Sequence, residues 1–253
     1  MEVFLMDSHA HMADEAFKED LAEVLSRAKG AGVFSILSVS EKLLDAERTL
    51  ELSEQYPMLL PAAGLAPSHL NLREAEVLLD FIRRERGRLR AIGEVGLDYW
   101  VAKAEGERAL QGEIFKGFID LAVEVDLPLN VHSRAAGGRV IELLLRLGAS
   151  RVQLHAFDGR AKNALPGVEA GFFFSIPPSI VRSPQKQKLV KSLPLEVLLV
   201  ESDSPVLGPT GGERNEPANV LIAIDAIARI KGVSKEVVIE AISENARKLY
   251  LRR

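Results

Sequence analysis

Short apolar runs alternate along the chain with longer stretches in which apolar residues recur every three or four positions. The short runs have the length of buried strands, and the longer stretches have the period of amphipathic helices. The eight predicted strands are residues 3–9, 33–39, 59–65, 90–96, 128–132, 151–155, 171–175 and 197–203. The predicted helices are residues 14–30, 41–55, 73–87, 106–126, 136–147 and 184–193, followed by a closing pair at 217–231 and 234–250.

Alternation of strand and helix over eight units is typical of a (β/α)₈ TIM barrel, an α/β fold with a parallel sheet. No linker, internal repeat or low-complexity tract interrupts the 253 residues, so we expect one barrel domain over 1–253. In this fold the active site lies at the carboxyl ends of the strands. The Gly/Pro-rich stretch 204–217 is predicted to be a long loop over that end.

Polar side chains end five of the predicted apolar strands. They are His9 in the first strand, Glu94 in the fourth, His132 in the fifth, His155 in the sixth, and Glu201 and Asp203 in the eighth. The segment "MDSHAH" adds His11, which the alternation of a strand places on the same face as His9 and Asp7. Two solvated turn histidines would also explain this segment alone, but the convergence of five strand ends favours a metal site.

Imidazole and carboxylate are the ligand types to consider, because the chain has no cysteine. Glu94 lies between glycines in "GEVGLDY", and a carboxylate can bridge two cations. His132 and His155 supply nitrogens for a second ion. An ion pair of Glu94 with Arg90 or Arg134, or histidines hydrogen-bonded in the core, would explain each residue singly.

The two acidic residues of "VESDSP" suggest how the reaction would proceed. Asp203 fits a ligand that also accepts a proton from the attacking water, and Glu201 could tune that proton transfer. The ligand types suit Zn²⁺, Mn²⁺ and Fe²⁺, whereas Mg²⁺ disfavours nitrogen. We therefore expect two divalent ions, with Zn, Mn or Mg as the candidates.

The net charge of −4 and the isoelectric point near 5.8 exclude a protein that coats nucleic acid through a broad basic face. They allow an enzyme that handles nucleic acid at one local, metal-neutralised site. No targeting signal and no apolar run of membrane-spanning length is visible, so we expect a cytoplasmic protein without a membrane partner. A compact acidic barrel is compatible with a monomer.

Seven segments resemble, in order and spacing, the TatD family of metal-dependent deoxyribonucleases within the amidohydrolase-like barrels. They read "MDSHAH", "GEVGLDYW", "LPLNVHSR", "LHAFDG", "FFFSI", "VESDSP" and "RNEP". The resemblance implies hydrolysis of DNA phosphodiester bonds, often as a 3′ to 5′ exonuclease on single strands or damaged ends. It implies one metal site of His9, His11, Glu94 and Asp203, a second of Glu94, His132 and His155, and Glu201 as an acid or base.

The chain departs from the family pattern at two loops. A histidine is usual in a "GxHP" segment, where this chain reads "GLAP" with Ala66, and His69 three residues later either reaches the same place or is inert. An Arg-Gly-Lys run is usual before "NEP", where Gly211 and Glu213 replace the two cations. Loss of two positive charges should weaken the grip on a polyanion.

Candidate substrate contacts are Arg134, Ser175, Arg214, Asn215 and His69. For Arg134 and Arg214, a structural ion pair with a carboxylate is the alternative. Tyr99 and Trp100 could stack on a base, although packing against a helix would also explain at least one of them.

Three functions remain open from the sequence. The first is a DNA phosphodiesterase acting on single-stranded DNA or 3′ ends through metal-activated water. The second is a metal-dependent amide or ester hydrolase, such as a deacylase of aminoacylated nucleic acid, which the two loop departures favour. The third is a non-catalytic, metal-binding scaffold, which would predict a degraded ligand set.

Overall fold

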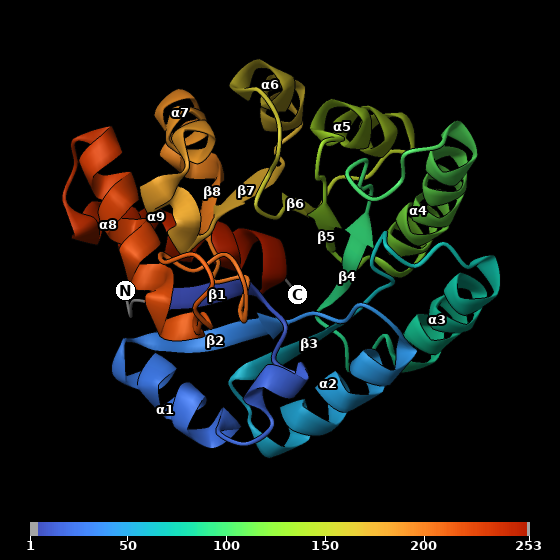
Figure 1. Ribbon diagram of the computed structural model, residues 1–253, viewed down its shortest axis with the longest axis horizontal. Helices are drawn as coiled ribbons and strands as arrows, with labels where there is room; N and C mark the ends of the chain where they lie inside the picture. Colours follow the sequence, from blue (N-terminus) through green and yellow to red (C-terminus); the bar gives the residue numbers. More distant parts are fainter. Residues whose placement is uncertain (1–4, 252–253) are drawn as a thin grey trace.

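The computed structural model describes residues 5–251 and contains eight parallel strands in the order β1 to β8, each hydrogen-bonded to the next. Figure 1 looks down the barrel and shows the helices arranged around it. The strands are β1 Leu5–Ala10, β2 Val33–Ser38, β3 Leu59–Ala63, β4 Ala91–Gly96, β5 Leu129–His132, β6 Val152–Leu154, β7 Phe173–Ile176 and β8 Leu198–Val200. The prediction of a TIM barrel is confirmed.

The barrel closes between β1 and the chain that follows β8. The Asp203 amide donates to the His9 carbonyl at 2.9 Å, and the His11 amide donates to the Ser204 carbonyl at 2.8 Å. These bonds lie at the carboxyl ends of the two strands. Closure of the barrel therefore places the acidic residues after β8 directly beside the histidines that end β1.

Nine α-helices surround the strands within the described residues: α1 Leu21–Gly30, α2 Leu43–Gln55, α3 Leu72–Glu85, α4 Glu105–Val125, α5 Gly137–Arg146, α6 Ala161–Glu169, α7 Pro184–Ser192, α8 Val220–Lys231 and α9 Lys235–Tyr250. Helix α7 begins as its sequence predicts, because the Ser183 hydroxyl caps the Lys186 amide and Pro184 occupies the first helical position. Helix α9 follows Ser234, the first residue of the predicted range, whose hydroxyl caps the helix by accepting from the Val237 amide. Among residues 5–251, no helix is both long and apolar enough to cross a membrane.

Two predicted elements differ from those observed. Residues 14–30 were expected to form one helix, but Asp14 caps a 3₁₀ turn at Glu15–Phe17 and α1 begins only at Leu21. No residue range was predicted for the helix after the sixth strand, α6, which contains Pro166 in its interior, a residue that normally argues against a helix. Residues 3 and 4 of the first predicted strand lie outside the described residues.

The interior of the barrel has an apolar end and a polar end. Apolar residues of the strands form one buried cluster with the last turn of α9, which includes Leu249 and Tyr250. A larger cluster fills the layer between strands and helices. Toward the carboxyl ends of the strands the buried residues become polar, with His9, Asn130 and Gln153 all fully buried. This polar end is the barrel mouth.

Candidate metal centre at the barrel mouth

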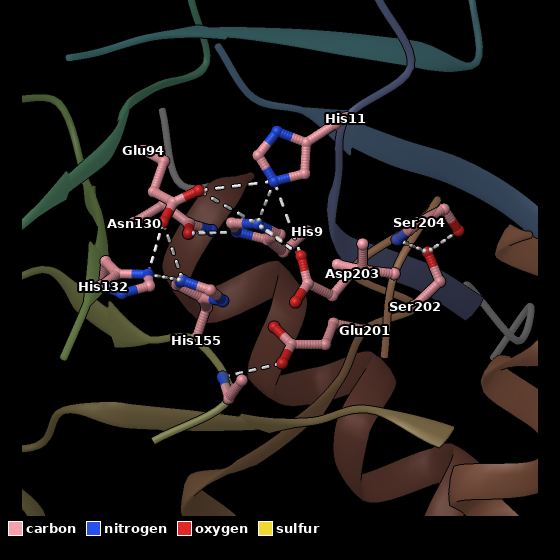
Figure 2. Close-up of polar contacts among 12 residues, drawn as sticks. His9, His11, Glu94, Asn130, His132, His155, Glu201, Ser202, Asp203 and Ser204 are labelled. Carbon is pink, nitrogen blue, oxygen red and sulfur yellow. Dashed lines mark hydrogen bonds and ion pairs between the residues drawn. The ribbon is translucent and has the colours of Figure 1, made fainter. Parts of the chain in front are cut away.

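The six predicted metal ligands meet at the barrel mouth (Figure 2). They come from β1, β4 and β5 and from the residues that follow β1, β6 and β8: His9, His11, Glu94, His132, His155 and Asp203. Strand β8 ends at Val200, earlier than predicted, so Glu201 and Asp203 belong to the loop that follows. Asp203 has a positive φ of 54°, a conformation uncommon outside glycine. This turn brings its carboxylate to the two histidines of β1.

Four ligand atoms form the first donor cluster: His9 Nε2, His11 Nε2, Asp203 Oδ1 and Glu94 Oε2. His9 Nε2 lies 3.2 Å from His11 Nε2, 3.3 Å from Asp203 Oδ1 and 3.7 Å from Glu94 Oε2. His11 Nε2 lies 3.4 Å from Glu94 Oε2 and 3.5 Å from Asp203 Oδ1. Ligands about 2.1 Å from a tetrahedral ion would be roughly 3.4 Å apart. The spacing of this cluster therefore fits a divalent cation.

The other oxygen of Glu94 belongs to a second donor cluster. Glu94 Oε1 lies 2.6 Å from His132 Nδ1 and 3.2 Å from His155 Nε2, and these two nitrogens are 3.0 Å apart. The carboxylate of Glu94 thus has one oxygen in each cluster. This is the arrangement of a carboxylate that bridges two cations.

The glycines beside Glu94 allow β4 to approach β5 closely. A Cβ atom on Gly96 would lie 2.1 Å from the His132 carbonyl oxygen, and one on Gly93 would lie 2.7 Å from the Asn130 side chain. Neither distance is possible for a real Cβ, so only glycine fits at both positions. The close approach keeps Glu94 within reach of the β5 histidine.

A buried network that was not predicted orients His9. Asn130 donates its amide to the Ser8 carbonyl at 3.0 Å and to the Tyr250 hydroxyl at 3.2 Å, so its oxygen faces His9 Nδ1 at 2.7 Å. His9 Nδ1 must then carry the proton, which leaves the Nε2 lone pair directed into the first cluster. The signal was present in the sequence, because Asn130 and Gln153 lie two residues before His132 and His155 and share their face of the strand.

Asp98 has the corresponding role for His132 and was also missed. Its Oδ2 lies 3.2 Å from His132 Nε2, so the proton of this ring belongs on Nε2 and the Nδ1 lone pair faces the second cluster. Its Oδ1 accepts the backbone amides of Trp100 and Val101 at 2.8 and 3.1 Å. Asp98 lies beyond the end of β4, where strand alternation no longer predicts which way a side chain points.

Close packing of acids and imidazoles shifts the pKa of several groups. Burial alone would lower the pKa of His9, but Asp203 and Glu94 outweigh it and raise the pKa to about 10. Burial likewise opposes the charge on His132, and Glu94 and Asp98 raise its pKa to about 9. Burial and the neighbouring charge of His9 lower the pKa of His155 to about 4. Without a cation, the centre therefore keeps protons where the ions would bind.

The family of the chain follows from comparison with known proteins. A family model described as TatD related DNase matches residues 6–251. The chain belongs to the TatD-related DNase family. It is 45% identical over 260 residues to the human deoxyribonuclease TATDN3, covering 98% of this chain and 95% of that protein.

Further comparisons agree with this TatD assignment. The chain is 33% identical over 253 residues to the uncharacterised metal-dependent hydrolase YabD of Bacillus subtilis (strain 168), covering 97% of this chain and 98% of that protein. The crystal structure of the TatD homologue YJJV from Escherichia coli k12 superposes with a TM-score of 0.91 at 26% identity, and each chain is covered completely.

Glu201 lies beside the TatD centre but makes no contact with either cluster at hydrogen-bond distance among the described residues. Its Oε1 accepts the Ala156 amide at 2.7 Å, and its Oε2 accepts the Ser175 hydroxyl at 2.5 Å. Burial and the nearby Asp203 raise the pKa of Glu201 to about 8, although the charge of His9 opposes them. Its role as an acid or base stays a prediction.

Two of the predicted substrate contacts are buried. The Ser175 hydroxyl is fully buried between Glu201 and Gln153. Asn215 is also buried, and its amide donates to the carbonyls of Ser202 and Val206, which shapes the loop after β8. Both side chains are therefore buried and hydrogen-bonded within the fold, and their role as substrate contacts stays a prediction.

Arg214 forms the structural ion pair that the sequence left as an alternative. Its guanidinium donates to both oxygens of Asp20, at 2.7 and 2.5 Å, and to the Ala16 carbonyl at 2.6 Å. The loop 204–217 is thereby fastened to the segment between β1 and α1. The positive charge of Arg214, the arginine of this loop, is thus neutralised by Asp20 and is not available to a substrate.

His69 and Arg134, the other two predicted contacts, differ in whether they are free to contact a substrate. His69 pairs with Glu74 of α3, its Nδ1 being 3.5 Å from the carboxylate, and it joins neither cluster. Ala66, where TatD relatives usually have histidine, is buried. Arg134 is exposed and lies over the Trp100 ring, 5.0 Å from its centroid, with no ion pair found among residues 5–251. Arg134 is the predicted cation that remains free for a substrate.

A cavity of about 500 Å³ opens beside His11. It lies between the segments that follow β1 and β2, and apolar residues such as Met12 and Leu44 line it. Its charged lining is mixed, with the cations Lys18, Lys42 and Arg48 beside the acids Asp14, Glu15, Glu41 and Asp45. Its volume falls in the range of small-ligand sites. A substrate held at the first cluster could extend into this cavity.

Proposed function

We propose that the protein is a metal-dependent DNA phosphodiesterase that removes nucleotides from 3′ ends, with two divalent ions (Zn, Mn or Mg) at its barrel mouth. The observation that carries the proposal is Glu94, whose two oxygens each join a separate donor cluster. The relatives named a deoxyribonuclease and a metal-dependent hydrolase support it.

The ligands fit the ions because imidazole nitrogens and carboxylate oxygens converge at suitable spacing, with no lysine or arginine paired to them among residues 5–251. Two bound ions would supply an activated water and positive charge to offset the charge developing at phosphorus. Without the ions, hydrogen bonds from His11 and His9 overcome burial and lower the pKa of Asp203, so this carboxylate is ionised. With the ions bound, Asp203 would be the residue that accepts a proton from the attacking water. Glu201 is the proposed acid or base beside it.

The proposed substrate is single-stranded or 3′-recessed DNA. The free cations near the centre are few, and the chain is acidic overall, so a duplex with two phosphate backbones would meet more repulsion than a single strand. Arg134 and the cavity beside His11 lie on either side of the clusters and would accept the ends of a short strand. We expect activity to fall with salt along a shallow slope, because few phosphates are contacted.

The test is a substrate panel supplied in turn with Mg²⁺, Mn²⁺ and Zn²⁺. It contains 5′-labelled single strands, 3′-recessed duplexes, blunt duplexes, phosphomonoesters, lactones and amides. The proposal expects shortening of single strands and recessed ends from the 3′ side, and slower action on blunt duplexes. Equal rates on blunt duplex and single strand, or a steep loss of activity with salt, would contradict the substrate assignment.

One observation favours a second candidate, an amide or ester hydrolase such as a deacylase of aminoacylated nucleic acid. The loop 204–217 offers no free arginine because Arg214 is paired with Asp20, so a polyanion gains little from this side. Hydrolysis of amides or lactones in the panel, with no cleavage of phosphodiesters, would establish this alternative. Binding of two ions without hydrolysis of any substrate would point instead to a scaffold.

A further inference from the structure

Lys186 was not among the predicted site residues, but its ammonium lies at the barrel mouth. It lies in the first turn of α7, and its side chain is partly buried. Its Nζ donates to the Ala156 carbonyl at 3.3 Å, and Ala156 directly follows His155, a ligand of the second cluster. A side chain rooted on the helix after β7 therefore reaches the carboxyl end of β6.

The peptide units around Ala156 connect Lys186 to the acidic side of the mouth. The Ala156 amide donates to Glu201 Oε1 at 2.7 Å, while its carbonyl accepts from Lys186. Ala156 has a positive φ of 40°, and this sharp turn exposes both of its polar groups to side chains. Lys186 thus sits between the ends of β6 and β8, where the second cluster and the Asp203 loop meet.

The ammonium of Lys186 has more donor protons than the described residues use. A lysine has three donor protons, and the Ala156 carbonyl uses one of them. Among residues 5–251, no carboxylate oxygen lies within ion-pair distance of its Nζ, although Glu201, Asp158 and Asp203 are close enough to stabilise the charge. Burial lowers the pKa of Lys186 against these attractions. A partly desolvated cation with unused donors is suited to an anion that arrives with the substrate.

Other cations near the mouth are less suitable. Arg214 and Arg27 are committed to Asp20 and Glu216. Arg134 lies over the Trp100 ring, and Lys103 lies 4.7 Å from the centroid of the same ring. Of these residues, only Lys186 makes a hydrogen bond to the peptide that follows a metal ligand.

We propose that Lys186 is a substrate-binding residue whose ammonium donates a hydrogen bond to a non-bridging oxygen of the phosphate held at the two clusters. This assignment rests on the proposed phosphodiesterase function. It gives the site a cation from α7, separate from the loop where Gly211 and Glu213 stand. A neutral amide or lactone would gain nothing from it.

The experiment compares three variants with the wild type, each loaded with Mn²⁺. Lys186→Met removes the charge while keeping an unbranched side chain, Lys186→Arg keeps the charge, and Lys188→Met is the control on the exposed side of the same helix. Inorganic phosphate is titrated calorimetrically as the probe, metal content is measured by mass spectrometry, and kinetics are measured on a single-stranded oligonucleotide.

Loss of a charge-assisted hydrogen bond should weaken phosphate binding by Lys186→Met about 10- to 100-fold, with metal content unchanged. Lys186→Arg should recover most of the affinity, and Lys188→Met should match the wild type. The assignment would be overturned if the wild type did not bind phosphate, or if Lys186→Met bound it as tightly as the wild type. It would also be overturned if Lys186→Met lost manganese together with phosphate, because Lys186 would then only hold the loop of His155. A wild type that cleaves DNA while Lys186→Met is equally active refutes the lysine alone, whereas a wild type inactive on every phosphodiester refutes the proposed function.

Discussion

The two donor clusters share Glu94 but are held in place very differently. The first has four ligand atoms, and one of its imidazoles, His9, is fully buried and oriented by Asn130. The second has three, and His132 has 19% of its side chain exposed. His155 Nδ1 is buried with no hydrogen-bond partner among the described residues, and its ring is positioned mainly by stacking on His9 at a centroid distance of 3.9 Å.

This difference predicts unequal affinity for metal. Each cluster has one imidazole oriented by a hydrogen bond, His9 by Asn130 and His132 by Asp98, so the number of ligands and their burial distinguish the two. A site with more protein ligands binds its ion more tightly. A site with fewer protein ligands keeps positions open for water or substrate, as catalytic sites do. We therefore expect the first cluster to hold its ion firmly and the second to exchange its ion and to contact the substrate.

Substitution of Glu94 should disturb both clusters at once and have the largest effect. Glu94→Ala leaves three ligands in the first cluster and two in the second, so the first ion should bind more weakly, the second should be lost, and the hydrolytic rate should fall at least about 10³-fold, more than loss of one stabilising donor costs. Metal content by mass spectrometry and initial rates measure this, with Glu94→Gln as the variant that keeps the shape but loses the charge. Full metal occupancy and full activity in Glu94→Ala would refute the bridging assignment.

Two single variants, each lacking one imidazole of one cluster, test whether the two clusters bind metal unequally. His155→Ala leaves two ligands in the second cluster, so that ion should be lost and one ion per chain should remain. His11→Ala leaves three in the first cluster, so its ion should stay bound with affinity reduced at least about tenfold. His69→Ala is the control, because His69 pairs with Glu74 outside both clusters. Equal losses in the two variants would contradict the inequality of the sites.

The dependence of metal binding on pH should reflect the protons that the clusters retain. The pKa of His9 is raised to about 10 and that of His132 to about 9, so both rings are protonated at neutral pH and must lose the proton to bind an ion. Affinity should therefore increase with pH up to about 9, roughly tenfold per unit for each proton displaced. Calorimetry in buffers of different ionisation enthalpy should detect at least one proton released at each cluster. Affinity that is constant between pH 6 and 9 would exclude protonated rings.

The convergence of the six predicted ligands could be foreseen from sequence because a strand gives each residue a direction and a barrel brings all strand ends to one place. His9 and His11 show this most directly, since alternation puts both on one face. Asp7 shows the limit of the rule. It was expected to face the mouth with them, but the pairing of β1 with β2 is irregular between Asp7 and Ala10, and its carboxylate accepts from the Ser202 hydroxyl at 2.6 Å.

Loop contacts could not be predicted in the same way. The direction of Arg214 depends on Asp20, which is 194 positions away in the chain, and no local pattern connects them. Lys186 reads as one of several polar residues in "PQKQKLVKS", and only the path of α7 shows that its side chain reaches Ala156 while Lys188 is exposed. Helix α6 was missed because Pro166 lies within it. Its position after the sixth strand was the only indication.

The smallest effects are expected from substitution of Arg134 and Arg214, which lie in different loops near the mouth. Arg134 has no carboxylate partner among the described residues, so Arg134→Ala should raise KM for single-stranded DNA several-fold and reduce the salt slope by about one. Arg214 is already paired with Asp20, so Arg214→Ala should change KM little and lower the free energy of unfolding by at most about 1 kcal/mol. Rates at several salt concentrations and urea unfolding, with metal content checked in both variants, separate the two. A larger rise in KM for Arg214→Ala than for Arg134→Ala would show that the Asp20 pair opens when DNA binds, and that the loop 204–217 contacts phosphate after all.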